Sequence, residues 1–266
     1  MKTHLPLLDH NPWSPSKADM AARCALSFKY RYIDRIKGGP RGTPAKVGVT
    51  VHRAQELVFE GLAVKEALAQ SIVDVDEELT HKEEEKVRTF AQSLLDFKAK
   101  VDKFTAKHPA KEVFLERKWA VTADFEPCDF FDDNGMVRGI VDMGILLENG
   151  YLIIIDHKSG RMHPMSHFGT QLDIYSVMAH AYYPEVKGVQ CALNFMARDQ
   201  VEWGKPKTSK YVVEVLRPWL IKYLNDRAEA VASFSARLGT HCRWCDYRDI
   251  CPEQVGNGNG ETSKQG

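Results

Sequence analysis

Two acidic residues and one lysine lie where two apolar segments end, and together they could hold a divalent cation beside a phosphate ester. Asp142 closes the segment Gly139-Ile-Val-Asp142, and Asp156 follows the apolar residues 152–155, with Lys158 two positions later. Side chains alternate along a strand, so Asp156 and Lys158 are expected on one face. Paired carboxylates repel each other unless a cation lies between them, and hard oxygen ligands suit Mg²⁺ or Mn²⁺. A lysine beside the ion could position or deprotonate a water, or neutralise charge that develops on the phosphate.

A purely structural interpretation of the polar residues stays open. Asp-x-Lys is a common tripeptide, and Asp156 and Lys158 could form a salt bridge on a surface hairpin. His52 could be an ordinary hydrogen-bonded histidine in a helix. Gln171 and Tyr175, four positions apart, share a helix face and could be the polar edge of a core helix.

The acids need a hairpin to position them, and the hydrophobic pattern predicts one. Strands are predicted over Val137–Leu147 and Tyr151–Asp156, joined by Glu148-Asn149-Gly150, where Asn-Gly favours a tight hairpin. Further strands are predicted over residues 112–121 and 189–197, with 201–203 pairing with the latter. Helices are predicted over residues 14–33, from about residue 48, and over 62–73, 80–107, 165–183 and 208–238, the last kinked or started by Pro218. The pattern therefore predicts an α/β fold, followed by a disordered tail from Gly256.

Three cysteines near the C-terminus form a metal-ligand pattern. Cys242-Arg-Trp-Cys245 and Cys251 give C-x2-C-x5-C, and a fourth ligand could come from Cys24 or His241. Sulfur tetrahedra accept zinc or an iron–sulfur cluster, so the spacing alone leaves both metals open. The other two cysteines, at positions 128 and 191, have no partner pattern and are interpreted as ordinary thiols.

The order of these motifs resembles that of the RecB-like PD-(D/E)XK nucleases. Gly48-Val-Thr-Val-His52 is followed by Gly139-x-x-Asp142, then Asp156-x-Lys158, then Gln171-x-x-x-Tyr175. The resemblance implies a restriction-endonuclease-like core with a central mixed sheet flanked by helices, formed by residues 1–254 as a single nuclease domain, with 255–266 as the tail.

The same resemblance implies a role for each motif residue. His52, Asp142 and Asp156 would bind the metal together with the backbone carbonyl of His157, and Lys158 would be catalytic. Gln171 and Tyr175 would contact DNA or shape the site. Two acids on the preceding strand, Glu116 and Glu112, compete for the place of an extra metal ligand, and Glu116 is preferred.

The cysteines extend the resemblance to an iron–sulfur subgroup, namely the AddB-type nuclease domains and the CRISPR-associated RecB-like exonucleases. In that subgroup a [4Fe–4S] cluster is held by one distant cysteine and three at the end of the chain. Here this implies Cys24 with Cys242, Cys245 and Cys251, so that the cluster would join the helical N- and C-terminal parts.

Charge and hydropathy add further expectations. The chain has 36 basic and 36 acidic residues, but residues 23–53 hold eight Lys or Arg and one acid, and residues 54–85 hold ten acids and two lysines. The basic run, with Phe28, Tyr30 and Tyr32 to stack on bases, is predicted to line the path of a DNA strand, although the two runs could also be ordinary solvated helix surfaces. No apolar segment approaches the roughly 20 residues that span a bilayer, so a cytoplasmic protein that binds no membrane is expected.

Together these features predict a metal-dependent DNA nuclease that contains no P-loop motor. An exonuclease acting on single-stranded DNA or on duplex ends is expected, in recombination, repair, phage DNA metabolism or CRISPR adaptation, with a helicase, recombination or CRISPR adaptation partner. Two alternatives stay open: a catalytically silent iron–sulfur DNA-binding or scaffold subunit, and a zinc-stapled enzyme of unrelated chemistry. Retention of His52, Asp142, Asp156 and Lys158 favours the nuclease.

Overall fold

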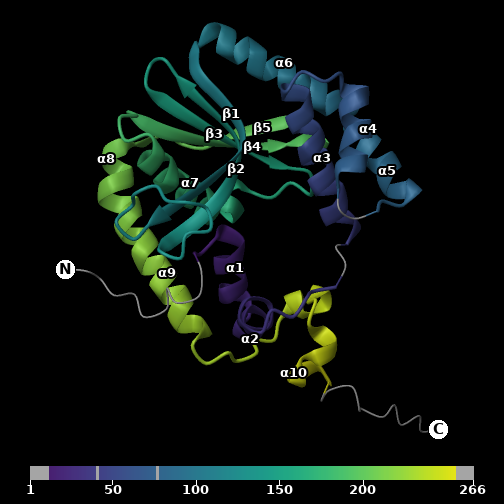
Figure 1. Ribbon diagram of the computed structural model, residues 1–266, viewed down its shortest axis with the longest axis vertical. Helices are drawn as coiled ribbons and strands as arrows, with labels where there is room; N and C mark the ends of the chain where they lie inside the picture. The colour runs from purple at the N-terminus through teal and green to yellow at the C-terminus, as the bar shows by residue number, and fades with distance from the viewer. Residues whose placement is uncertain (1–11, 40–41, 76–77, 256–266) are drawn as a thin grey trace.

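A mixed β-sheet forms the centre of the computed structural model, which describes residues 12–39, 42–75 and 78–255 (Figure 1). The expected tail from Gly256 lies outside the described residues. The strand order is β1 (Ala110–Thr122), β2 (Gly135–Leu147), β3 (Tyr151–Lys158), β4 (Gly188–Phe195) and β5 (Gln200–Trp203), and the short β6 (Lys207–Thr208) also pairs with β4. Only the β3–β4 pair is parallel among these strands. The predicted α/β fold with a mixed sheet flanked by helices is therefore confirmed.

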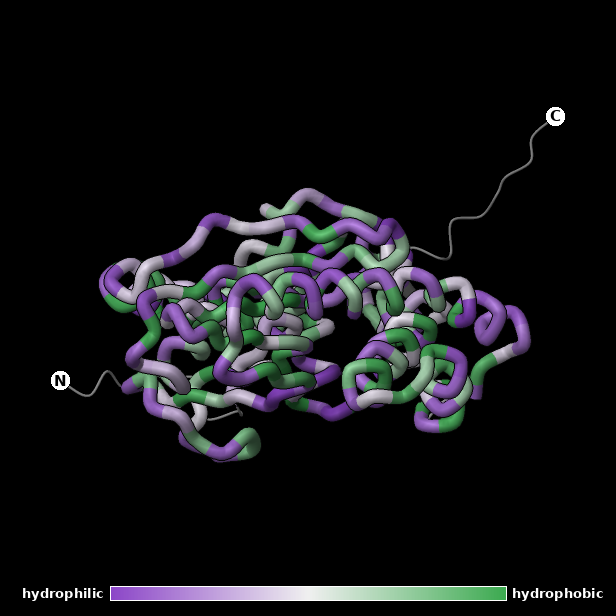
Figure 2. Tube along the Cα trace, turned by 90° about the horizontal axis from the view of Figure 1, so that it is seen from above, coloured by the Kyte–Doolittle hydropathy of each residue, from purple (hydrophilic) through white to green (hydrophobic). Residues whose placement is uncertain are grey.

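Helices cover both faces of the sheet, which explains why β3 is apolar on both sides. On one face, Leu152 and Ile154 lie in a core with α7 (Gly169–Tyr182), α9 (Arg217–Val231), α1 (Pro15–Arg23) and α2 (Ala25–Phe28). On the other face, Ile153 and Ile155 pack against α6 (Ala91–Lys107). Figure 2 is turned by 90° from Figure 1 and shows that the molecule is thinnest along the direction in which Figure 1 is viewed. Hydrophobic segments lie mainly inside the molecule.

A second helical core extends the α6 side of the molecule. It is built from α3 (Thr43–Phe59), α4 (Val64–Asp74) and α5 (His81–Arg88) together with the start of α6. The single helix predicted over residues 80–107 is wrong, because the chain divides after Arg88. Val87 on α5 and Leu94 on α6 both pack into the second core, as does Phe90 in the turn between them, whereas Phe97, further along α6, packs on the sheet.

The helix predicted over residues 14–33 is also interrupted. Cys24 has an extended backbone (φ −161°, ψ 114°), so α1 ends before it and α2 continues into a π-helical turn, Lys29–Ile33. The helix predicted over 208–238 consists of α8 (Ser209–Tyr211), a π-helical turn (Val212–Leu216) and α9, and it ends at Val231. The remaining elements are short helices: Met165–Phe168, Met196–Arg198, Thr240–Trp244, Arg248–Ile250 and α10 (Pro252–Val255).

The C-terminal segment returns to lie beside the first helices, as Figure 1 shows for α10 and α2. Tyr247 donates a hydrogen bond from its hydroxyl to the carbonyl of Ile36 (3.1 Å), and Tyr30 donates one to the carbonyl of Ile250 (3.3 Å). The Arg237 guanidinium donates to the carbonyl of Ala22 at 3.2 Å. The two ends of the described chain therefore contact each other.

Gly144 in β2 is required by the packing of the first core. A Cβ atom at this position would lie 2.0 Å from Cζ of Phe114 on the neighbouring strand. We expect Gly144→Ala to lower the free energy of unfolding by about 1–3 kcal/mol or more, because an overpacked core must shift its backbone or an aromatic ring. Urea unfolding measures this, with Gly169→Ala as the control because a Cβ there meets nothing within 4 Å. Equal stability of both variants would contradict the packing described.

Candidate active site

The ends of β2 and β3 bring the acids and the lysine of the hairpin together. Alternation along β3 directs Asp156 and Lys158 towards α7 and His157 towards α6. The Lys158 Nζ lies 2.7 Å from Oδ2 of Asp156, whose residue is only 2% exposed. Asp142 accepts a hydrogen bond from the backbone N–H of His157 (2.7 Å), which ties the two strand ends to each other. The ion pair between Asp156 and Lys158 is therefore largely buried, unlike a salt bridge on a surface hairpin.

Gln171 on α7 connects the lysine, the acid and a tyrosine. Its amide nitrogen donates to Oδ1 of Asp156 and to the hydroxyl of Tyr175, both at 2.9 Å, and its amide oxygen accepts from Lys158 at 3.2 Å. The Tyr175 hydroxyl in turn donates to the carbonyl of Ile140 on β2 (2.9 Å). Every hydrogen-bonding group of the Gln171 side chain is thus used to hold the site. Gly139 makes the arrangement fit, because a Cβ there would lie 2.9 Å from the Tyr175 ring.

A second cluster lies next to this network. His52 on α3, Glu116 on β1 and Asp142 on β2 have ligand atoms that all lie within 4.8 Å of one another. Nδ1 of His52 is 3.6 Å from Oδ2 of Asp142, and the histidine side chain is 27% exposed. Gly48, one helical turn before His52, lets α3 approach β3, since a Cβ there would lie 2.9 Å from Oγ of Ser159. An imidazole and two carboxylates from three elements are thus within reach of one ion.

Burial raises the pKa of Asp142, Asp156 and Glu116, and neighbouring acids add to the effect at Asp156 and Glu116. Burial raises the pKa of Asp142 to about 6 and, together with the charge of Asp142, that of Asp156 to about 6. Burial and the neighbouring acids raise the pKa of Glu116 to about 7. Burial lowers the pKa of His52, which favours the neutral imidazole that binds metals. A concentration of buried negative charge of this kind is stabilised by a cation.

Comparison with known proteins identifies the family of this site. The family model of the PD-(D/E)XK nuclease superfamily matches residues 12–252. The chain belongs to the PD-(D/E)XK nuclease superfamily. The recognition made from the order of the sequence motifs is therefore confirmed at the level of the superfamily.

A solved structure shares the fold of this superfamily member. A candidate exonuclease from Eubacterium rectale superimposes with a TM-score of 0.53 at 11% sequence identity, covering 99% of this chain and 93% of that one. The structure of SSO0001 is less similar, with a TM-score of 0.33 and 15% identity over 86% of this chain and 95% of that one. No curated protein matches significantly in sequence. None of the helices in the described ranges has the length and apolarity to cross a membrane.

The structure distinguishes between the two acids of β1 in this PD-(D/E)XK chain. Glu112 lies away from the site, where it pairs with Arg117 (2.6 Å) and accepts from the Tyr183 hydroxyl (2.8 Å). Glu116 lies beside Asp142 and has a positive φ of 42°, which a non-glycine residue rarely adopts. Strained backbone of this kind is common at functional sites.

One residue near the site was not predicted. Asn194 on β4 is 2% exposed, and its side-chain nitrogen lies 3.0 Å from Nδ1 of His157. The His157 ring in turn stands edge-on to His52 (centroids 5.8 Å apart) and to Phe97 (5.1 Å). The polar Asn194 between the apolar Leu193 and Phe195 of the predicted strand was the available signal.

The basic run predicted to line a strand path is largely engaged elsewhere. Phe28 is 3% exposed and stacks on Trp13, so its predicted stacking on bases is wrong. Arg53 pairs with Asp74 at 2.8 Å, and Lys29 pairs with Asp34 at 2.6 Å. These cations already have carboxylate partners in the folded chain.

The four predicted cluster ligands gather where the two ends of the described chain meet. Burial raises the pKa of Cys245, and the charges of Cys24, Cys242 and Cys251 add to this effect, so these three thiols lie near Cys245. Burial acts to raise the pKa of Cys24, but hydrogen bonds from the backbone of Arg237 and from Ser27 outweigh it and lower the pKa. Cys191 is buried in the main core and hydrogen-bonds Ser176 (3.4 Å), far in sequence from this group.

Proposed function

We propose that this chain is a divalent-metal-dependent DNA nuclease whose centre is built from His52, Glu116, Asp142, Asp156 and Lys158. The observation that carries the proposal is the convergence of these residues, from α3, β1, β2 and β3, on one end of the hairpin. Membership of the PD-(D/E)XK nuclease superfamily supports the reaction, phosphodiester hydrolysis. The complete set of residues favours an active enzyme over a silent scaffold.

The donor set fits a divalent ion. Ligands about 2.0–2.2 Å from Mg²⁺ or Mn²⁺ lie no more than roughly 4.4 Å apart, close to the 4.8 Å that limits the spread of the His52, Glu116 and Asp142 atoms. Asp156 and the His157 carbonyl would complete the ligands. When bound, the ion would supply Lewis acidity at the phosphate and lower the pKa of a nearby water.

The residues of the chain divide the remaining work. Lys158, held by Asp156 and Gln171, would place a positive charge beside the phosphate, where it stabilises developing negative charge and orients the attacking water. Gln171 and Tyr175 would be positioning residues, because they hold Asp156 and the β2 backbone rather than face a substrate through a free group.

The four cysteines fit an iron–sulfur cluster better than zinc. In a tetrahedral zinc site, with Zn–S of about 2.3 Å, the sulfurs lie roughly 3.8 Å apart. Among the residues described, no three cysteines have their sulfurs within 4.8 Å of one another, although the other three thiols lie near Cys245. A [4Fe–4S] cube takes one thiolate on each of four irons and so holds them further apart. We propose that Cys24, Cys242, Cys245 and Cys251 hold such a cluster, which would pin the two chain ends within one nuclease domain.

Digestion of end-labelled DNA tests the proposed function. Purified, cluster-loaded protein should cleave single-stranded DNA or the ends of duplex DNA with Mg²⁺ or Mn²⁺, and chelation by EDTA should stop the reaction. If every form of DNA stays intact with both Mg²⁺ and Mn²⁺, the proposed nuclease activity is wrong. The setting proposed is recombination, repair, phage DNA metabolism or CRISPR adaptation, beside a helicase or another partner of those systems.

The imidazole of His52 leads to a prediction about metal preference. Nitrogen ligands favour Mn²⁺ over the harder Mg²⁺, so we expect faster cleavage with Mn²⁺. His52→Ala should lower the ratio of the Mn²⁺ rate to the Mg²⁺ rate, which initial rates at saturating metal measure. His81→Ala is the control, because His81 is a largely exposed histidine on α5. An unchanged ratio in His52→Ala would exclude His52 as a ligand.

The exonuclease assignment predicts that DNA ends are needed. We expect linear duplex or single-stranded DNA to be degraded, while covalently closed duplex circles are largely spared over the same time. Gel analysis of both substrates in one reaction, with the circle linearised beforehand as the control, measures this. Rapid linearisation of closed circles would instead identify an endonuclease.

A further inference from the structure

A large cavity is lined by Ser159, the residue that follows the proposed catalytic lysine in the chain. Its volume is about 1220 Å³, which exceeds the roughly 300–1,000 Å³ of ordinary small-molecule sites. One wall is the loop that follows Lys158, residues 159–162, and the opposite wall is formed by the end of α5 and the start of α6. The turn Met196–Arg198 after β4 closes a third side. The cavity therefore leads from the end of β3, where the site lies, towards the helical core of α3–α6.

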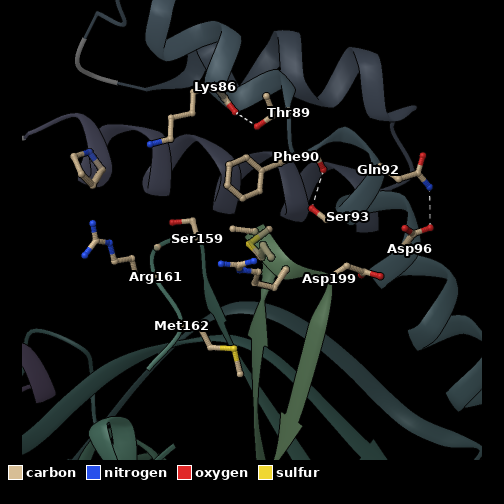
Figure 3. A pocket seen from close by; sticks show the side chains of 15 residues that line it. Lys86, Thr89, Phe90, Gln92, Ser93, Asp96, Ser159, Arg161, Met162 and Asp199 are labelled. Carbon is tan, nitrogen blue, oxygen red and sulfur yellow. Dashed lines mark hydrogen bonds between the residues drawn. The ribbon is translucent and has the colours of Figure 1, made fainter. Parts of the chain in front are cut away.

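Three cations line this cavity without a carboxylate partner. They are Lys86 on α5, Arg161 on the loop and Arg198 after β4, and no ion pair of the described residues includes them. Figure 3 shows Lys86 and Arg161 on the same side of the cavity, projecting from elements on opposite walls. This differs from Arg23, Lys29 and Arg53 of the basic run, each of which is paired with an acid. Unpaired cations facing one cavity favour a polyanion.

The same cavity has two acids, of which one is paired with a cation and the other only hydrogen-bonded. Asp199 pairs with Lys100 at 2.7 Å. Asp96 accepts a hydrogen bond from the Gln92 amide at 2.9 Å, on the same helix, as the dashed line in Figure 3 indicates. The three free cations therefore set the sign of the cavity's charge.

The lining of the cavity also includes apolar side chains, which favour one form of DNA over the other. Met162 is 39% exposed in the wall, and Phe90 and Met196 form an almost buried floor. A duplex presents phosphates and groove edges to a protein, whereas a single strand also presents the faces of its bases. Cations and apolar side chains in one cavity therefore suit a single strand.

We propose, on the basis of the nuclease function proposed above, that this cavity is the track that delivers a single DNA strand to Lys158. Lys86, Arg161 and Arg198 bind its phosphates, and Met162 contacts the bases. The substrate class is thus single-stranded DNA, including the frayed end of a duplex.

Binding in EDTA tests the track independently of cleavage. The probe is a fluorescent 20-nucleotide single strand, compared with a blunt duplex of the same sequence, titrated at several KCl concentrations. At 100 mM KCl we expect Arg161→Ala/Arg198→Ala to weaken single-strand binding at least tenfold. The slope of log affinity against log salt should fall by about 1.4, since each phosphate contact on a single strand contributes about 0.7. Parent and variant should bind the duplex weakly and alike.

A matched control removes two cations on the other side of the molecule. Lys210 and Lys222 lie on α8 and α9, away from α5 in Figure 1, and their side chains are 79% and 76% exposed. Lys210→Ala/Lys222→Ala should bind the single strand like the parent. Equal losses in both double variants, or a tenfold loss of duplex binding together with single-strand binding, would overturn the track.

Photocrosslinking of the unaltered protein gives a second measurement that needs no variant. A strand with photoreactive bases should form adducts on Met162 or Phe90, mapped by mass spectrometry, and adducts found only elsewhere would overturn the track. Failure of the nuclease proposal is distinguishable. In that case DNA stays intact when metal is added, while the binding and crosslinking results are unaffected.

Discussion

Replacing Lys158 by alanine should reduce DNA cleavage by about a hundredfold to a thousandfold, while the fold and the cysteine-bound cluster remain intact. The loss is of the size seen when one group that stabilises transition-state charge is removed. The fold should survive because Asp156, left without its 2.7 Å ion-pair partner, still accepts a hydrogen bond from Gln171 and can take up a proton.

Single-turnover rates, thermal melting and iron content, measured side by side, check this expectation. Lys222→Ala is the matched control, because the Lys222 side chain is 76% exposed on α9 and should leave all three values unchanged. Lys158→Arg keeps the positive charge but changes the shape of the side chain, so its cleavage rate separates the effect of charge from that of geometry. This variant should have the melting temperature of the parent. A Lys158→Ala protein that cleaves DNA at the parent rate would move the catalytic centre away from the hairpin.

Replacing Cys245 by serine should act first on stability. A cluster that ties Cys24 to the C-terminal cysteines closes a loop of roughly 220 residues, and cross-links over loops of that order stabilise by several kcal/mol. In a protein of this size 1 kcal/mol corresponds to about 2–4 °C, so we expect the melting temperature to fall by about 10 °C or more. The variant should also lose iron, colour and resistance to proteolysis, and activity should be lost as a consequence.

Cys128→Ser is the control for the thiol itself. Cys128 is partly exposed, like Cys245, but the charges on its pKa come from Asp132 and Asp129 rather than from other thiols. It should keep the parent's iron content and melting temperature. A Cys245→Ser protein that melts like the parent and cleaves DNA normally would mean that the cysteines do not staple the fold. Zinc in place of iron in the parent would contradict the cluster proposed.

Strong local signals account for what could be predicted from the sequence. The Asn149-Gly150 turn and the alternation along β2 and β3 predicted the hairpin, and therefore placed Asp142 near Asp156. The four-residue spacing of Gln171 and Tyr175 predicted their shared helix face, and both do contact each other. In each case the spacing along the chain is short, so one element of regular structure determines the geometry.

Tertiary contacts account for what could not be predicted. The extended backbone at Cys24 is held by contacts with residues more than 200 positions later, such as Arg237 with Ala22, and no helical period reports them. The break after Arg88 lies within one apolar stripe, because Val87, Phe90 and Leu94 on either side of it pack into the same core, so the stripe does not report it. The preference for Glu116 over Glu112 came from the family resemblance, because the alternation of β1 encodes neither the left-handed backbone at Glu116 nor the Arg117 partner of Glu112.

Counting bound Mn²⁺ while measuring cleavage tests the central claim most directly. Metal is removed by chelation and returned stepwise, with free Mn²⁺ followed by electron paramagnetic resonance and cleavage of labelled single-stranded DNA followed in the same samples. The site formed by His52, Glu116 and Asp142 predicts that the rate rises with occupancy of the protein by Mn²⁺. It also predicts that Asp142→Asn weakens Mn²⁺ binding and cleavage together, whereas Glu112→Gln changes neither. Cleavage that persists in excess chelator, or Mn²⁺ binding that is unchanged in Asp142→Asn, would contradict a metal-dependent nuclease centre at this hairpin.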